Sequence, residues 1–245
     1  MIKKICRAFS RRTLNHWENS PWLFAFACRT KDYGGTGMYT LHWEYMAGSI
    51  VVQAILEEMD APYRLQHVDM AAGEHKMPEY RRLNPAARVP ALTLPDGGTI
   101  GESAAIVVVL GERSPETDLV PRLGTADRSV FFFWLNVMAT SGYMTVARKG
   151  HPERYAVDEE AIAQVEQKAA EDLADFFDVM EDVISGDGTF LESGHTALDL
   201  YLTMLTEWSD NKDDLFRTRP SLARLTGEVS LRPGYQAAMR THRLN

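Results

Sequence analysis

The stretch from Ala86 to Leu110 reads AARVPALTLPDGGTIGESAAIVVVL and decides the fold. Its residues 90–94 predict a short apolar strand that opens with a proline, and Pro-Asp-Gly-Gly at 95–98 predicts a tight turn. A second short strand at 99–101 then leads directly into a helix. The sequence therefore predicts a small hairpin followed by a helix.

The hairpin and the helix create a corner. Val89 comes just before the first strand, and Glu102-Ser103 begin the helix, so these residues are predicted at the same end of one small sheet. A corner that combines a main-chain edge with a helix N-terminus can hold a small zwitterionic peptide by its backbone and by its charges.

Upstream of this corner, strands and helices alternate. Residues 38–44 and 63–68 predict strands, and between them Ser49 predicts the N-cap of a helix over 50–59. That helix is apolar on nearly all sides, which predicts that it is buried. Two strands joined by one helix indicate parallel pairing, and a short helix at 78–83 completes the order β-α-β-α-β-β-α of an α/β domain.

The second half of the chain carries no strand signal. Residues 114–124 contain two prolines and a glycine and predict a linker between a domain over 38–113 and a second domain over 125–245. The second domain is predicted to be all-helical, with helices at 126–147, 158–184, 196–208, 220–228 and 233–239. The third of these opens on Thr196-Ala-Leu-Asp199, which predicts a reciprocal capping box.

The composition narrows the class of protein. The 245 residues are 45% hydrophobic and 24% charged, as in an ordinary globular chain. The net charge of −8 argues against nucleic acid as the main partner, because binding to phosphates needs a basic face. No apolar run predicts a membrane span, and the seven histidines lack the spacing of a metal site, so we expect no metal.

Residues 1–37 differ from the rest of the chain. They carry seven Lys/Arg against two Asp/Glu, a net charge of +5, so the remaining residues carry −13. Both cysteines, Cys6 and Cys28, lie here, which leaves the body of the chain without a disulfide or a cysteine nucleophile. We expect a disordered extension or an upstream start codon, and a cytoplasmic protein; the alternative is a secretory signal that ends at Cys28.

Three motifs together resemble the glutathione S-transferases. They are NPAARVPAL at 84–92, GESAAI at 101–106 and the capping box at 196–199, in this order within residues 38–245. The resemblance implies a thioredoxin-like N-terminal domain followed by a helical-bundle domain, with glutathione as co-substrate. It also implies a homodimer and a small hydrophobic electrophile as the second substrate.

The resemblance places glutathione in the corner described above. Pro90 would follow a cis peptide bond, and the N–H and C=O of Val89 would bind the cysteinyl part. Glu102 would pair with the ammonium of the γ-glutamyl end, and the Ser103 hydroxyl with its neighbouring amides would bind the carboxylate. Arg88 would approach the peptide or its glycyl carboxylate. Without a ligand, Ser103 would be an ordinary N-cap and Glu102 a solvated charge.

Glutathione transfer needs a thiolate, because the neutral thiol is a poor nucleophile. A hydroxyl donor at the N-terminus of the first helix can stabilise that charge beside the helix dipole. Ser49 holds this position and is the first candidate, with a plain N-cap as the alternative; Tyr45 is the second candidate and His42 the third. Gly48 stands where cysteine-using relatives have their nucleophile, which excludes their mixed-disulfide chemistry.

The electrophile should meet the sulfur between the two domains. Residues 131–134 and 143–148 are candidates to line that cleft, and His151 and Arg154 are candidate polar contacts, with core packing and solvent exposure as the alternatives. Three functions stay open. The chain conjugates glutathione to an electrophile, or it catalyses another glutathione-dependent reaction such as isomerisation, ether cleavage or dehalogenation, or it is a non-catalytic binding module.

Overall fold

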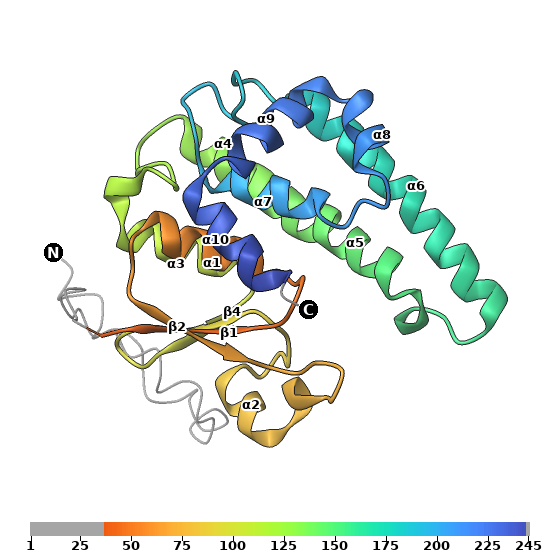
Figure 1. Ribbon diagram of the computed structural model, residues 1–245, viewed down its shortest axis with the longest axis horizontal. Coiled ribbons are helices and arrows are strands. Elements are labelled where there is room, and N and C mark those ends of the chain that lie inside the picture. The colour runs from red at the N-terminus through yellow and green to blue at the C-terminus, as the bar shows by residue number, and fades with distance from the viewer. Residues whose placement is uncertain (1–36, 244–245) are drawn as a thin grey trace, which may run out of the picture. The chain divides into compact units, whose positions relative to one another are not determined.

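The computed structural model describes residues 37–243, so the predictions for residues 1–36 lie outside the described chain. Up to Arg113, strands and helices alternate (Figure 1). The order β-α-β-α-β-β-α expected from the sequence is confirmed, and this half is thioredoxin-like. Its elements are β1 (Tyr39–Trp43), α1 (Ser49–Glu58), β2 (Tyr63–His67), α2 (Pro78–Leu83), β3 (Ala91–Thr93), β4 (Thr99–Gly101) and α3 (Ser103–Arg113).

The four strands form one sheet in the order β2-β1-β3-β4. β1 and β2 are parallel, as predicted, whereas β3 is antiparallel to both β1 and β4. His42, Ala91 and Gly101 lie side by side in register across β1, β3 and β4. The ends of β1 and β4 therefore meet the start of β3 at one end of the sheet, from which the chain enters α1 and α3.

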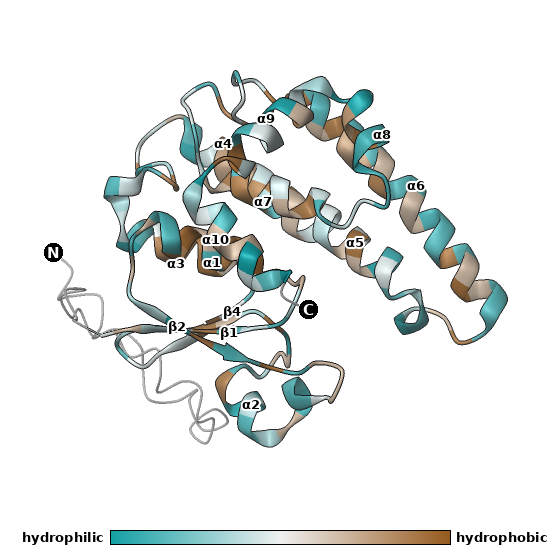
Figure 2. Cartoon of the chain, viewed as in Figure 1, coloured by the Kyte–Doolittle hydropathy of each residue, from teal (hydrophilic) through white to brown (hydrophobic). Residues whose placement is uncertain are grey.

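Helix α1 lies at the centre of the core. Figure 1 shows α1 and α3 on one face of the sheet and α2 on the other. Six apolar residues of α1 are fully buried, which confirms the prediction from its all-round apolar surface: Ile50, Val51, Val52, Ala54, Ile55 and Leu56. Figure 2 shows the same apolar character in α7, which packs near α1.

After β4, the named elements of the described chain are helices. They are α3, α4 (Asp127–Val137), a π-helical turn (Met138–Gly142), α5 (Tyr143–Gly150), α6 (Glu159–Val183), α7 (Ala197–Thr206), α8 (Lys212–Arg217), α9 (Pro220–Ser230) and α10 (Pro233–His242). Short 3₁₀ turns occupy Glu74–Lys76, Pro115–Thr117 and Pro152–Arg154. The sequence analysis missed the π-helical turn and α8, whose cap is the Asn211 side chain accepting from Asp214 N–H at 3.1 Å.

One continuous helix, Asp127–Gly150, comprises α4, the π-helical turn and α5. By length and composition it could cross a membrane, although the sequence analysis expected no such segment. Phe131, Leu135, Met138 and Val146 of this helix are buried in the core, which accounts for part of its apolar character. Core helices of folded domains meet the same two criteria, so the helix is weak evidence for a membrane span.

The C-terminal helix attaches the helical half to α1. Arg232 at the start of α10 binds Glu58 through two hydrogen bonds of 2.8 and 2.6 Å, and Gln53 Nε2 donates to Thr241 Oγ1 at 2.9 Å. Gly234 permits close packing here, because a Cβ on it would stand 3.2 Å from the Ala54 carbonyl oxygen. The helical half is therefore fixed to the helix that begins at the shared end of the sheet.

The predicted capping box is present at the start of α7. Thr196 N–H donates to Asp199 Oδ2 at 2.7 Å, and Thr196 Oγ1 accepts from Leu198 N–H at 3.3 Å. Asp199 Oδ1 also accepts from Phe190 N–H at 2.6 Å. One carboxylate therefore holds both the first turn of α7 and the loop before it.

Candidate functional site

The corner predicted from the sequence forms at the shared end of the sheet. The Val89–Pro90 peptide bond is cis, as the resemblance implies. The main chain just before it is fixed, because Arg88 C=O accepts from Tyr80 Oη at 2.7 Å and from Asn84 Nδ2 at 2.8 Å. Val89 is only 9% exposed, yet its own N–H and C=O have no hydrogen-bond partner within residues 37–243. Buried main-chain groups are normally paired, so this edge is suited to the peptide of a ligand.

Glu102 faces solvent from a strained position. Its φ of 62° lies in the left-handed region that disfavours residues other than glycine, and strain of this kind clusters at ligand sites. In the described chain the Glu102 carboxylate has no ion-pair partner, and no side chain caps the first turn of α3. A carboxylate beside uncapped helix amides is complementary to the ammonium and carboxylate of an α-amino acid.

Ser103 joins this corner to the helical half. Its hydroxyl is buried and lies 2.8 Å from Tyr201 Oη of α7. A hydroxyl has one hydrogen to donate and two lone pairs, so Ser103 retains capacity for a further bond while it contacts Tyr201. Burial raises the pKa of Tyr201, which keeps that phenol neutral.

Arg88 is the cation of the corner. It is exposed, and its Nη1 lies 4.0 Å from Met144 Sδ of α5. No carboxylate pairs with the Arg88 guanidinium in the described part of the chain, whereas Arg113 and Arg128 form ion pairs with Asp96 and Glu112. The structure thus brings together the four predicted binding residues, Arg88, Val89, Glu102 and Ser103, with one unpaired charge of each sign.

Ser49 is placed differently from the expectation. The N-cap of α1 is Gly48, so the prediction of Ser49 as the N-cap is wrong; Ser49 is the first helical residue. It is fully buried, and its hydroxyl donates to Glu44 C=O at 3.2 Å, which ties the start of the helix to the end of β1. Its role in activating a thiol stays a prediction.

The other two candidate activators contact the sheet. The ring of Tyr45 packs against Trp43 and His67 at centroid distances of 4.8 and 5.2 Å, on the β2 side of β1, while the corner lies on the β3 side. His42 is buried with Nε2 3.0 Å from Thr93 Oγ1 of β3, and burial lowers its pKa. His42 lies at the same end of the sheet as the corner, but within residues 37–243 neither His42 nor Tyr45 forms a hydrogen bond or a ring contact with Arg88, Val89, Glu102 or Ser103.

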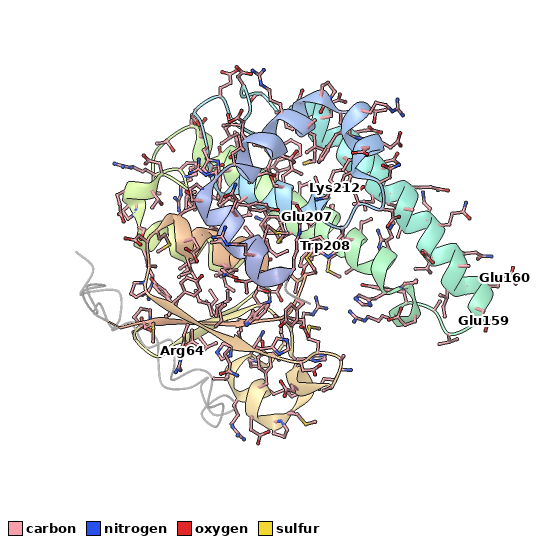
Figure 3. The ribbon with its side chains drawn as sticks, viewed as in Figure 1. Arg64, Glu159, Glu160, Glu207, Trp208 and Lys212 are labelled. Carbon is pink, nitrogen blue, oxygen red and sulfur yellow. The ribbon has the colours of Figure 1, made fainter. Side chains whose placement is uncertain are left out.

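A residue of the helical half reaches the start of α1 instead. Tyr143 Oη accepts from Gly48 N–H at 2.8 Å, across 95 positions of sequence. Its ring stacks on Trp208, with centroids 5.5 Å apart and planes at 30°, and Trp208 Nε1 donates to Met46 C=O at 3.2 Å. Figure 3 labels Trp208 just after α7, beside Glu207 and Lys212. The loop between β1 and α1 is therefore held by two aromatic side chains of the helical half.

Most of the other residues predicted to line the cleft make their contacts outside the corner. Phe131 is a core residue, whereas Phe133 is 59% exposed. Arg148 donates to Asp172 Oδ2 at 3.2 Å, and His151 and Arg154 both contact the exposed Glu153. Within 143–148, Met144 contacts Arg88 of the corner and Tyr143 contacts Gly48 at the start of α1, and sequence spacing offers no reason to prefer these two residues.

Known proteins are similar to this chain in sequence and in fold. Residues 49–113 match the family described as glutathione S-transferase, N-terminal domain. The uncharacterized GST-like protein YncG of Escherichia coli K12 is 24% identical over 200 residues, which are 80% of this chain and 95% of that protein. The maleylacetoacetate isomerase of Dictyostelium discoideum is 38% identical over 68 residues, 28% of this chain and 30% of that enzyme.

A solved structure shares the fold of this chain. A glutathione transferase homolog from Sulfitobacter, crystallised with bound glutathione, has the same fold, with a TM-score of 0.75 and 24% identity over 84% of this chain and 99% of that chain. The match of the N-terminal domain, the related sequences and the shared fold lead to one conclusion: residues 49–113 are a glutathione S-transferase N-terminal domain, and the chain is similar to glutathione S-transferases in sequence and in fold.

Proposed function

We propose that this chain is a glutathione transferase that binds glutathione in the corner between β3 and α3 and presents its sulfur to a hydrophobic electrophile. The unpaired main chain of Val89 carries the proposal, because it offers one donor and one acceptor to the cysteinyl residue. Glu102 and the first-turn amides of α3 would bind the γ-glutamyl head, and Arg88 would bind a carboxylate.

The proposed reaction is a nucleophilic displacement. The thiol proton passes to solvent, the thiolate attacks the electrophilic carbon, a C–S bond forms, and the leaving group departs with the bonding electron pair. The thiolate forms at the N-terminus of α1, where the partial positive charge of the helix favours an anion. The protein thus acts mainly by lowering the thiol pKa and by holding the two reactants together.

A second candidate is a glutathione-dependent isomerisation. The identity to a maleylacetoacetate isomerase favours it, although the aligned segment spans only 30% of that enzyme. Both reactions would use the same glutathione site and differ in the substrate that the helical half admits. Activity screens with a chlorodinitrobenzene and with a cis-unsaturated diketo acid separate the two candidates.

Titration of the purified chain with glutathione by calorimetry tests the proposal. We expect saturable binding with one site per chain and weaker binding of the dipeptide that lacks the γ-glutamyl group, because Glu102 and α3 then lose their partner. Turnover of the chlorodinitrobenzene completes the test. A titration that releases no heat and shows no saturation with glutathione would contradict the proposal, because the chain would then not bind glutathione.

We also propose that the chain forms a homodimer. Val130 and Phe133 of α4 are 42% and 59% exposed, so this helix presents apolar side chains to solvent as well as to the core. Burying such residues against a second copy would be favourable. Light scattering at the mass of a dimer supports this proposal, and the mass of a monomer at micromolar concentration opposes it.

A further inference from the structure

The hydroxyl of Tyr143 fills the space that a side chain at residue 48 would occupy. A Cβ built on Gly48 would stand 2.8 Å from Tyr143 Oη and 3.1 Å from two carbons of its ring. Residue 48 is the N-cap of α1, so a side chain there would lie beside the first-turn amides, at the end of the helix that favours an anion. The helical half thus supplies a hydroxyl where the N-terminal half has only a glycine.

The hydrogen-bond geometry leaves this hydroxyl able to donate. Tyr143 Oη accepts from Gly48 N–H, and no acceptor for its own hydrogen occurs within residues 37–243. Because a donor that itself accepts a bond is polarised, the Gly48 amide strengthens Tyr143 as a donor. The stack on Trp208 fixes the ring, so the hydroxyl is positioned in advance.

Burial keeps the phenol of Tyr143 protonated. Burial raises the pKa of Tyr143, with a smaller opposite effect from the Gly48 amide; Glu102 adds to the rise and Arg88 opposes it. These are the two charged residues of the glutathione corner, so Tyr143 lies within range of the bound peptide's charges. Tyr201, the other phenol near the corner, bonds to Ser103 and is neutral.

Resting on the proposed function, we propose that Tyr143, from the helical half, is the catalytic residue that donates a hydrogen bond to the glutathione thiolate. Ser49, buried and bonded to Glu44, then serves to hold α1 against β1. Donation to the charged form of a group lowers its pKa, so Tyr143 would increase the fraction of thiolate at neutral pH. No proton leaves Tyr143 during the reaction.

The test compares Tyr143→Phe with Ser49→Ala in the full chain. Phenylalanine keeps the ring and its stack on Trp208 and removes the hydroxyl alone. The ultraviolet absorbance of the thiolate, followed against pH at saturating glutathione, reports the thiol pKa. We expect Tyr143→Phe to raise it by about one unit and to lower kcat/KM with a chlorodinitrobenzene about tenfold at neutral pH. The activity should recover at alkaline pH, and calorimetric affinity for glutathione should stay within about twofold.

Three comparisons make the outcome decisive. Tyr155→Phe, at an exposed tyrosine, is the matched control and should leave the thiol pKa unchanged. An unchanged thiol pKa in Tyr143→Phe with glutathione still bound overturns the inference alone, and so does a shift seen in Ser49→Ala instead. Wild-type chain that binds no glutathione refutes both the proposed function and the inference.

A second experiment makes the Tyr143 hydroxyl a stronger hydrogen-bond donor instead of removing it. Site-specific replacement of Tyr143 by a fluorinated tyrosine, whose hydroxyl is more acidic, should lower the thiol pKa in step with the acidity of the phenol. A purely structural hydroxyl would give the same thiol pKa with each fluorinated residue. Such a flat response would contradict the inference.

Discussion

Replacing Asp199 by alanine is expected to destabilise the fold by about 2–5 kcal/mol, because it leaves buried N–H groups without an acceptor. Asp199 is fully buried and accepts from Phe190 N–H, Thr196 N–H and Thr196 Oγ1 at 2.6, 2.7 and 3.2 Å. Alanine removes all three bonds and opens a polar cavity. Urea denaturation followed by circular dichroism measures the loss.

The effect should depend on pH. Burial raises the pKa of Asp199 to about 6, so the folded state holds the proton more tightly than the unfolded state, and ionisation reduces stability as the pH rises from about 4 to about 6. The alanine variant has no carboxyl group to titrate at this position. The difference in free energy of unfolding between wild type and the variant should therefore be larger at pH 5 than at pH 7.5. Asp158→Ala is the matched control, because this exposed carboxylate caps α6 through Ala161 N–H alone. We expect the free energy of unfolding of Asp158→Ala to fall by only about 0.5–2 kcal/mol. Equal losses in the two variants would show that the buried hydrogen bonds of Asp199 stabilise the fold no more than an exposed cap does.

Replacing Glu102 by glutamine is expected to weaken glutathione binding about tenfold to hundredfold, equivalent to about 1.4–2.8 kcal/mol. Glutamine keeps the size of the side chain and removes the charge that would meet the ligand ammonium. The exposed position of Glu102 limits the effect, because solvent and salt screen the pair. Calorimetry at low and at moderate salt measures the loss of affinity for glutathione and how far salt reduces that loss.

The control for Glu102 is a second exposed glutamate near α3. Glu116 lies beyond the C-terminal end of that helix and faces solvent, so Glu116→Gln changes the net charge equally without touching the corner. Its affinity for glutathione should match wild type. Equal affinities for both variants would mean that Glu102 does not bind the γ-glutamyl head.

The fold of the N-terminal half could be predicted because its signals are local. The apolar character of 50–56 sets the burial of α1, and the turn at 95–98 sets the hairpin that pairs β3 with β4. Helix α8 was missed because six residues give too little periodicity, although Asn211 followed by two aspartates is a helix-start signal that could have revealed it. The single helix predicted over 126–147 corresponds to the continuous helix Asp127–Gly150, and the π-helical turn within it was not predicted.

In the candidate site as well, the residues placed by local sequence signals could be predicted, and the contact made by distant segments could not. Val89, Glu102 and Ser103 lie within the single stretch 86–110, so their proximity follows from a hairpin and a helix start. The contact between Tyr143 and Gly48 depends on how α5 packs against the loop before α1, which no local pattern encodes. Ser49 was predicted as the activating residue from its place at the helix start, but its hydroxyl donates to the Glu44 carbonyl, five residues earlier in the chain.

The π-helical turn at Met138–Gly142 comes directly before Tyr143 and sets the angular phase of α5 relative to α4. An α-helix advances by about 100° per residue, so each residue gained or lost in this turn rotates everything after it by about that angle. Deleting one codon here would swing the phenol away from Gly48 while both helices kept their sequences. A change of chain length, without any substitution, is thus enough to disconnect the two halves of the site.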